Sequence, residues 1–298
     1  MSYTTGTAND MVAVRQALID ACVAGGWIWD AGTEVLSKGA IFVRVSVNNT
    51  DLLLFGRSSA GAGEMPVGRR MGEGVKVYSA PAFSWPVQYR IFVFQHEVYC
   101  VLQYAVEMFQ WLAFGKSSVS GLPGSGIWAE GTAKNGYTGE VVVNMGINSG
   151  EAYSYGICPA PFWITYTNGS ESTVGDVLHN DLDGGGWSLR DGSNVQLLGV
   201  RAIESLLKLL PNAWNSEGVL VPIRAYKIRP SSKASLVGDL EHARYIRVDN
   251  YVAAQILTIG HDRWMVFPFL RKNTEQRNGG SSLSHSGTFG WAIRYEGA

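Results

Sequence analysis

Charged side chains are scarce in this sequence. Asp, Glu, Lys and Arg make up 16% of its 298 residues, against roughly 25% in typical soluble domains. The formal net charge is −1, and no block of like charges is present. Proteins that bind nucleic acids usually carry a basic stripe, and amphipathic membrane anchors carry a basic face. We therefore expect neither a specific nucleic acid nor a membrane as a partner.

Long hydrophobic runs are missing as well. The longest apolar stretches, such as residues 41–47 and 98–106, have the length of strands or are broken by polar residues. A membrane span needs about 20 apolar residues. Residues 1–7 lack the basic and then apolar pattern of a secretion signal. We expect the protein to be made and folded in a cytoplasm.

The chain has only three cysteines, Cys22, Cys100 and Cys158. They lie far apart and form no CxxC pair, so the sequence supports neither a zinc knuckle nor a disulfide framework. Each lies among apolar residues, where a free cysteine behaves as a small hydrophobic side chain. We expect all three to be structural.

Motifs of catalysis and of cofactor binding are also absent. The five histidines form no HExxH pair, and the chain has no GxSxG, no P-loop and no complete dinucleotide-binding glycine pattern. Residues 205–208 match SxxK, but the companion motifs are missing and the match lies within a predicted helix. We predict that the protein is not an enzyme and uses no cofactor.

One acidic loop offers oxygen ligands. Asp176, Asp181 and Asp183 lie close to His179 in the sequence, and such carboxylates can hold a hard cation. The spacing does not match an EF-hand, because Gly185 occupies a ligand position and the closing Glu is absent. We interpret the segment as a polar loop and predict no metal site.

Glycine and aromatic residues, in contrast, are abundant. The chain contains 36 Gly, 10 Trp, 13 Tyr and 11 Phe, and glycine is about 12% of the residues where about 7% is usual. This composition favours a β-rich chain with many turns. It also fits a protein whose outer face is partly covered by neighbouring chains.

The first predicted element is an amphipathic helix. Thr7 to Asp10 offer capping side chains, apolar residues then recur at steps of three and four from Met11 to Cys22, and Gly25-Gly26 ends the pattern. A second helix is predicted over residues 199–210, where Pro211 stops it.

Most of the remaining chain predicts strands. Alternating or apolar runs occur at residues 27–29, 41–47, 51–55, 87–94, 97–106, 140–143, 162–166, 219–228, 243–248, 253–259, 264–267 and 289–295. Asn48-Asn49 predicts a hairpin between two of these runs, and Gln95-His96 predicts a tight connection between two others. Residues 58–74 and 117–125 are rich in Gly and Ser, which is typical of surface loops.

These elements predict a β-rich α+β fold. We expect antiparallel sheets, each covered by an amphipathic helix, with long Gly/Ser loops. The predicted division is an N-terminal helix-plus-sheet domain over residues 1–116 and a β-rich domain over residues 117–298. One integrated domain is the alternative.

Several segments together resemble a known class of protein. They are YTTGTANDMV (3–12), LSKGAIFV (36–43), VYCVLQY (98–104), FQWLAFGK (109–116), DRWMVFP (262–268) and HSGTFGWAIRY (285–295). This set resembles structural proteins of tailed-bacteriophage virions, including those of the neck or collar between head and tail. The matching stretches lie toward both ends of the chain, and residues 121–194 carry none of them.

The resemblance implies assembly in the virion as a homo-oligomeric ring that contacts portal, connector or tail proteins. A ring needs heterologous contacts that close, and protein interfaces favour aromatic and Arg anchors. The candidate interface residues are Trp111, Phe114, Trp128, Trp187, Trp214, Arg271 and Trp291.

Two other functions stay open. The first is a tail or baseplate component with a carbohydrate-binding surface, because exposed tryptophans such as Trp128, Trp187 or Trp214 can stack on sugar rings. The second is a host-type cytoplasmic enzyme, for which the sequence offers no motif.

Overall fold

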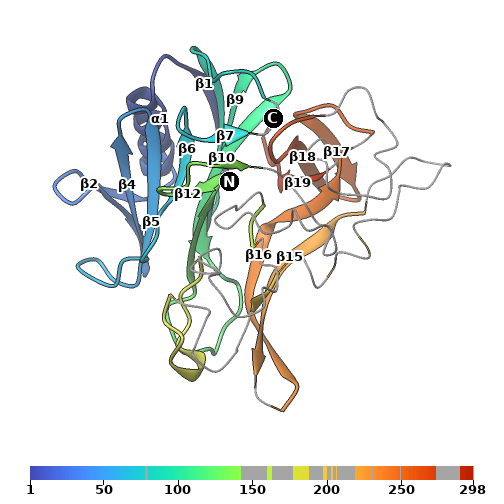
Figure 1. The fold of residues 1–298 in the computed structure, drawn as a ribbon. Coiled ribbons are helices and arrows are strands. Elements are labelled where there is room, and N and C mark those ends of the chain that lie inside the picture. The colour runs from blue at the N-terminus through green and yellow to red at the C-terminus, as the bar shows by residue number, and fades with distance from the viewer. Residues whose placement is uncertain are drawn as a thin grey trace.

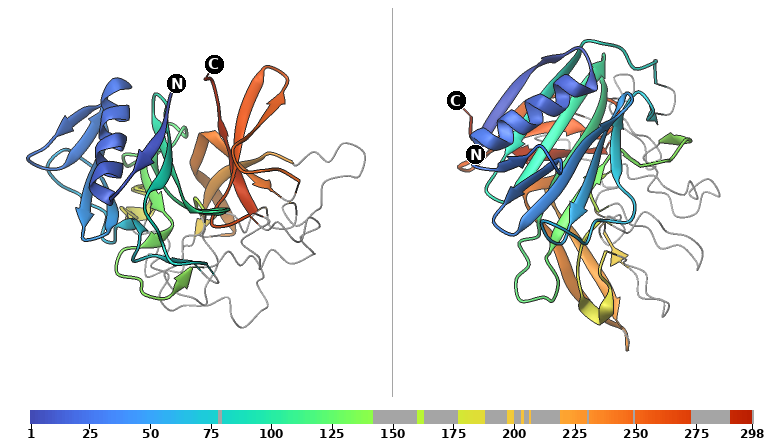
Figure 2. Two further views of the ribbon diagram at one scale, coloured as in Figure 1. Left: turned by 90° about the horizontal axis from the view of Figure 1, so that it is seen from above. Right: turned by 90° about the vertical axis from the view of Figure 1, so that its left-hand side faces the viewer.

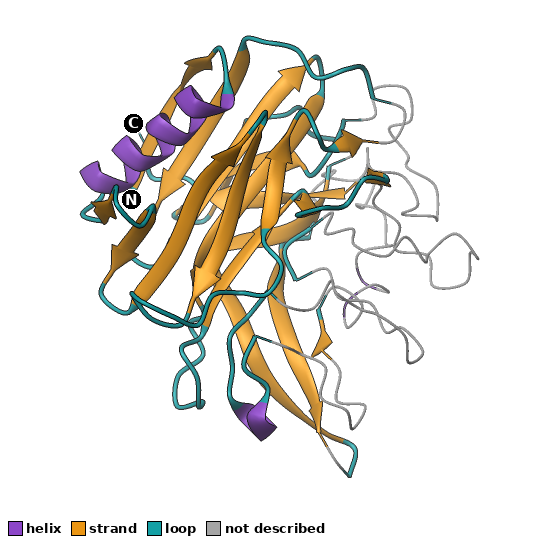
Figure 3. Ribbon diagram, turned by 60° about the vertical axis from the view of Figure 1, so that its left-hand side comes forward, coloured by secondary structure: helices purple, strands orange, loops and turns teal. Residues whose placement is uncertain are grey.

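The computed structural model describes residues 1–77, 80–141, 160–162, 177–187, 197–199, 203, 206, 219–229, 231–248, 250–272 and 289–297. Within them the chain is built mainly of strands, as Figure 3 shows. α1 (Met11–Ala24) is the one α-helix in this part of the chain. None of the described helices is long and apolar enough to cross a membrane.

Three antiparallel sheets form the framework. The central sheet has the order β1 (Ser2–Ala8), β8 (Val87–Val93), β9 (Glu97–Ala105), β10 (Met108–Lys116) and β11 (Ile127–Gly131). The N-terminal sheet has the order β12 (Ala133–Lys134), β6 (Arg69–Gly72), β5 (Asp51–Arg57), β4 (Ile41–Asn48), β3 (Val35–Lys38) and β2 (Ile28–Asp30). The C-terminal sheet has the order β14 (Leu197–Leu198), β15 (Val221–Arg229), β16 (Lys233–Arg247), β19 (Phe289–Arg294), β18 (Asp262–Pro268) and β17 (Gln255–Ile259).

Three short elements of the described chain lie outside these sheets. β7 (Lys76–Val77) and β13 (Glu140–Val141) form a parallel pair. The third is a 3₁₀ turn, η1 (Leu182–Gly184). It lies in the segment that contacts β11 through an antiparallel bridge between Leu178 and Trp128.

The three sheets stack in layers, with the central sheet in the middle (Figures 1 and 2). In β9, alternate side chains face opposite cores. Cys100 belongs to the core shared with α1 and the N-terminal sheet, whereas Tyr99 and Val101 belong to the core shared with the C-terminal sheet. The central sheet is therefore buried on both faces along β9 and β10, and these two strands are apolar almost throughout.

The helix α1 starts and ends where its sequence predicts. The Asp10 side chain caps it by accepting a hydrogen bond of 2.7 Å from the Ala13 N–H, and Gly25 is the C-cap. Val14, Leu18 and Cys22 are fully buried against the neighbouring sheets. The capping residues and the apolar spacing thus confirm the predicted helix.

The predicted α+β fold class is wrong: the described residues form a β-rich fold with α1 as its one α-helical element. We expected each sheet to be covered by a helix, but the C-terminal sheet packs on the central sheet instead. The physical reason is that the central strands present apolar side chains on both faces, so one sheet serves as the cover of two others.

Three further predictions concern the domain boundary, a loop and a second helix. The predicted domain boundary at residue 116 falls between β10 and β11, which pair with each other in the central sheet. The predicted loop over residues 58–74 contains β6, which pairs with β5. The predicted helix over residues 199–210 lies largely outside the described residues.

Candidate functional site

A pocket of about 480 Å³ opens where β10 leaves the central sheet. One wall is the loop of residues 117–126. The other walls come from β16, from the β8–β9 connection and from the segment that carries His179. The residues that line the pocket are His96, Lys116, residues 117–126, His179, Asn180, Val237 and Glu241.

The loop wall is fastened to the C-terminal sheet on one side. The Ser117 Oγ donates to the Val237 carbonyl (3.3 Å) and accepts from the Asp239 N–H (3.1 Å). The Ser118 N–H donates to the Asp239 carbonyl at 3.1 Å. These bonds hold the start of the loop against β16, so this wall is formed before any ligand arrives.

His179 fastens the other end of the loop. Its Nδ1 lies 3.0 Å from both the backbone N and the Oγ of Ser125. Because Nδ1 accepts the Ser125 backbone N–H, the neutral ring carries its proton on Nε2, which lies 3.8 Å from the Asp181 carboxylate. Burial lowers the pKa of His179, and the nearby Asp181 opposes that shift.

Gly124 allows a close backbone approach within the same wall. Its φ is +97°, and a Cβ there would lie 2.7 Å from the Asn180 Cα. A side chain is therefore excluded by both conformation and space.

The Ser125–His179 distance invites a comparison with nucleophilic catalysis, where a base lies within hydrogen-bond reach of a serine. Here both groups are already engaged in the turn. Nδ1 accepts the Ser125 N–H, and Ser125 Oγ accepts the Ile127 N–H at 3.3 Å. The geometry fits a fastening of the loop better than an activated nucleophile.

The side chain of Asn180 is the unusual group of the pocket. Asn180 is 2% exposed. Neither its Nδ2 nor its Oδ1 has a hydrogen-bond partner in the described part of the chain. An unpaired buried amide costs free energy, on the order of 1–3 kcal/mol, so this carboxamide lowers the stability of the fold where it stands.

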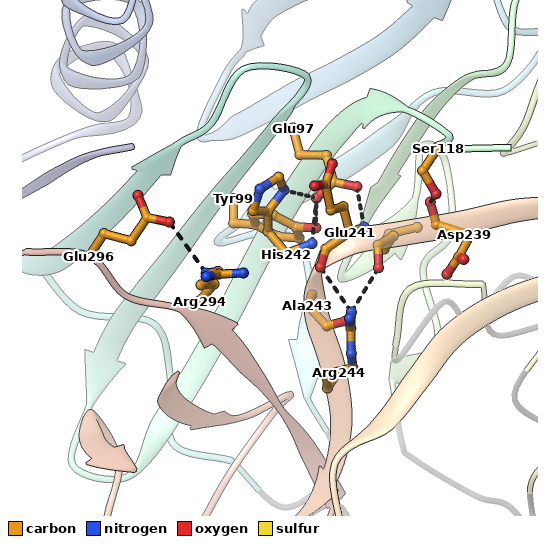
Figure 4. Close-up of polar contacts among 11 residues, drawn as sticks. Glu97, Tyr99, Ser118, Asp239, Glu241, His242, Ala243, Arg244, Arg294 and Glu296 are labelled. Atoms are coloured by element: carbon orange, nitrogen blue, oxygen red, sulfur yellow. Dashed lines mark hydrogen bonds and ion pairs between the residues drawn. The ribbon is translucent and has the colours of Figure 1, made fainter. Parts of the chain in front are cut away.

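A buried carboxylate lies beside the pocket and joins two sheets (Figure 4). Glu97, at the start of β9, is 1% exposed. Its oxygens accept from the backbone N–H groups of Glu241 and His242 (2.9 Å each), from the Tyr99 hydroxyl (2.8 Å) and at 2.9 Å from His242 Nδ1. The His242 ring stacks on Phe94 with centroids 4.0 Å apart. We name this cluster the Glu97 clasp.

A second buried carboxyl group, that of Glu130, lies in β11. Burial raises its pKa to about 8, while Arg69 and the Phe162 N–H act in the opposite direction. The Phe162 N–H donates to Glu130 Oε1 at 2.6 Å, and Oε2 has no hydrogen-bond partner among the residues that the structure describes. A carboxyl group with a shifted pKa can mark an active site. Glu130, however, lies in the core and not among the residues that line the pocket.

Metal ligands do not gather among the described residues, where no group of three His, Cys, Asp or Glu side chains has the geometry for an ion. Asp181 and His179 approach each other as described above. Asp176 lies outside the described residues, so the acidic loop as a whole is only partly placed.

A free sheet edge is the second feature that can engage another molecule. Among the described residues, β17 pairs with β18 alone and ends the C-terminal sheet. It contains no Lys, Arg, Asp, Glu or Pro, the residues that usually protect an edge strand. Ile256 and Ile259 in this strand, and Val252 just before it, are 42%, 50% and 66% exposed.

The predicted interface residues lie elsewhere. Five of them are in the core of the protomer, where they are not available to a neighbouring chain: Trp111, Phe114, Trp128, Trp187 and Trp291. Arg271 is half-buried, and its backbone pairs with that of Met108 in an isolated antiparallel β-bridge. Trp214 lies outside the described residues. The large aromatic side chains fill the space between the sheets, as with the Trp111 and Trp291 rings at 5.1 Å.

The residues that the structure brings to the surface were not predicted. The apolar run at 253–259 was assigned as a strand, but only the sheet order shows that it is an edge. Asn180 lies in the predicted acidic loop, and no sequence motif indicates that its side chain is buried without a partner. No protein-family model matches the chain, and no curated protein matches it.

Proposed function

We propose that this protein is a structural component of a tailed-phage virion that assembles with copies of itself at the neck or collar. Two observations support the proposal. One is the sequence resemblance of segments near both ends of the chain. The other, which carries the assembly itself, is the unprotected edge of β17.

The edge offers what strand addition needs. An edge strand exposes a row of backbone N–H and C=O groups that pair readily with another strand. Natural monomers block such edges with charge or proline, and β17 has neither within Gln255–Ile259. Its exposed isoleucines would lose their contact with water when a second strand is added.

The occupant that we propose is the free edge of another copy. β2 ends the N-terminal sheet, and Ile28 at its start is 68% exposed. β2 and β17 lie on opposite sides of the molecule (Figure 1). A contact between two different surfaces on opposite sides is heterologous, and repeated contacts of this kind close into a ring or extend into a filament.

Electron microscopy and sedimentation of the purified protein test the proposal. We expect closed rings of many copies in negative stain and a sedimentation coefficient far above that of one chain. A protein that stays monomeric at tens of micromolar, and that mass spectrometry does not find in purified phage particles, would contradict both parts of the proposal.

A further inference from the structure

We infer that residues 160–162 form a latch between the central and the C-terminal sheet, and that this latch loosens when the carboxyl group of Glu130 loses its proton. The three residues lie outside any helix or strand, and all of them are buried. The latch is independent of the proposed assembly, because neither β17 nor β2 contributes a residue to it. The inference rests on how the three residues are held, on the backbone of Phe162 and on the surroundings of Glu130.

The side chain of Phe162 fills a hole between the two sheets. Its ring packs against that of Trp128 on β11, with the centroids 5.9 Å apart. The ring also faces Gly238 on β16, where a Cβ would lie 2.9 Å from Cε2 of Phe162. Any side chain at position 238 would therefore press on the ring. Phe162 is thus inserted between one strand of each sheet and fits closely there.

Two side-chain hydrogen bonds hold the latch, one from each sheet. The Phe162 N–H donates to Glu130 Oε1 at 2.6 Å, and Glu130 belongs to β11 of the central sheet. The Tyr245 hydroxyl donates to the Pro161 carbonyl, and Tyr245 belongs to β16 of the C-terminal sheet. Within the described sheets, residues 160–162 belong to no strand. The latch can therefore leave its place without breaking a strand ladder.

The backbone of Phe162 favours opening. Its φ is +50°, in the left-handed region that a bulky side chain rarely adopts. Strain of this kind persists only where the surroundings impose it, and it is frequent in segments that switch. Here the fit of the ring and the hydrogen bond to Glu130 impose it. The strain is relieved when the latch opens, which offsets part of the cost of exposing the ring.

Glu130 couples the latch to pH. Its carboxyl group is 1% exposed, and burial raises its pKa to about 8, so it keeps its proton at neutral pH. In the described chain, the charged or titratable groups beside it are Arg69 from β6, which opposes the shift, and Tyr245 from β16. The neighbouring strand β10 places the uncharged Ala113 opposite Glu130.

An ionised Glu130 needs water that the closed latch keeps out. The strands β6, β11 and β16 are fixed by pairing in their sheets, whereas residues 160–162 are not. Displacing these residues is therefore the least costly way for water to reach the carboxylate. The open latch exposes Glu130 at its ordinary pKa of 4.5, so opening releases a proton at neutral pH. The equilibrium then shifts toward the open latch as the pH rises, by at most about tenfold per pH unit between the two pKa values.

Amide hydrogen exchange on the full chain tests the inference. Labelling with ¹⁵N-phenylalanine makes the Phe162 amide observable by NMR, and the Phe114 amide of β10 is the internal reference. Dividing each rate by that of an unfolded peptide removes the intrinsic effect of pH. We expect Phe162 to be at least about tenfold less protected than Phe114, because the latch opens without global unfolding. Its protection should fall by up to about tenfold per pH unit from pH 5 to about 8 and then level off.

Variants assign the effect to the latch. Glu130→Gln keeps the acceptor for the Phe162 N–H but carries no titratable proton, so the protection of Phe162 should no longer depend on pH. Glu140→Gln, at an exposed position, is the matched control and should keep the pH dependence. Tyr245→Phe removes the bond to the Pro161 carbonyl and should lower the protection of Phe162 by roughly tenfold at every pH. It tests the latch if Glu130→Gln does not fold.

Four results would overturn the inference. They are protection of Phe162 equal to that of Phe114, protection of Phe162 that stays constant from pH 5 to 8, the natural pH dependence in folded Glu130→Gln, and full protection of Phe162 in folded Tyr245→Phe. None of them bears on assembly, because rings can form through β17 whether or not the latch opens.

Discussion

The carboxylate of Glu97 and the backbone of His242 are 145 residues apart in sequence and 2.9 Å apart in space. Glu97 belongs to the central sheet and His242 to the C-terminal sheet. The same carboxylate also accepts from the Glu241 N–H and the Tyr99 hydroxyl. The Glu97 clasp therefore ties two sheets together beside the pocket, and every donor in it depends on one side chain.

Glu97→Ala should destabilise the fold strongly. It leaves buried donors of Tyr99 and of the β16 backbone without an acceptor, which we expect to lower the free energy of unfolding by about 3 kcal/mol. Denaturant unfolding followed by tryptophan fluorescence measures this change. Glu296→Ala is the control, because Glu296 is paired with Arg294 on the exposed surface. That variant should lose less than about 1 kcal/mol, and equal losses in the two variants would contradict the role of the clasp.

Glu130 should make stability fall with rising pH. Its pKa is about 8 in the folded protein, against 4.5 as the ordinary value. Between these values the folded state keeps the proton that the unfolded chain has released. The free energy of unfolding therefore decreases as the pH rises, by at most about 1.4 kcal/mol per pH unit from this group.

Glu130→Gln removes that dependence and keeps the acceptor for the Phe162 N–H. We expect the variant to gain stability relative to the natural chain as the pH is raised from 5 to about 8, as measured by denaturant unfolding at each pH. Glu140→Gln, at an exposed position, should shift stability by the same amount at every pH. If the difference in the free energy of unfolding between Glu130→Gln and the natural chain were also the same at every pH, the pKa of Glu130 would not be raised in the folded protein.

His179 should titrate below its ordinary pKa and should be the Nε2–H tautomer when neutral. The Ser125 N–H requires an unprotonated Nδ1, and burial disfavours the charged ring. The fastening of the loop is therefore present above pH 6.5, the ordinary value for histidine, and is lost as the pH falls through the lowered pKa. Long-range ¹H–¹⁵N NMR reports tautomer and pKa together. A Nδ1–H tautomer at pH 8, or a Ser125 amide signal that does not move with the titration of His179, would contradict this geometry.

Asn180→Leu should stabilise the protein. The substitution removes a buried carboxamide without a partner, which we expect to raise the free energy of unfolding by about 1 kcal/mol. Thermal unfolding of the two proteins measures the difference, and a clear loss of stability in the variant would indicate that Asn180 stabilises the fold.

Local elements of the fold could be predicted from the sequence, because their signals are local. The cap at Asp10 and the apolar spacing placed α1, and Asn48-Asn49 placed the β4–β5 hairpin. The sequence pattern does not predict β1, because Ser2–Ala8 has no apolar alternation and is held as an edge strand by its pairing with β8. β16 was assigned only in part, because its first half from Lys233 pairs with β15 with little apolar content of its own.

The stacking of the sheets and the sites could not be predicted in the same way. Trp111, Trp128 and Trp291 fill a core between two sheets of one chain, and an aromatic side chain suits an interface between two chains equally well. The sequence pattern does not distinguish these cases. Which strand is an edge, and whether Asn180 finds a partner, depend on contacts between distant segments.

The molar mass of the protein in solution, measured by light scattering during size-exclusion chromatography, tests the proposed assembly most directly. Ile256→Lys places a charge on the exposed edge of β17, and Val106→Lys is its control at a position that is 87% exposed in the β9–β10 turn. The account predicts a multiple of the chain mass for the natural protein and for Val106→Lys, and a single chain for Ile256→Lys. A natural protein that elutes as one chain, or an Ile256→Lys variant that assembles as the natural protein does, would contradict it.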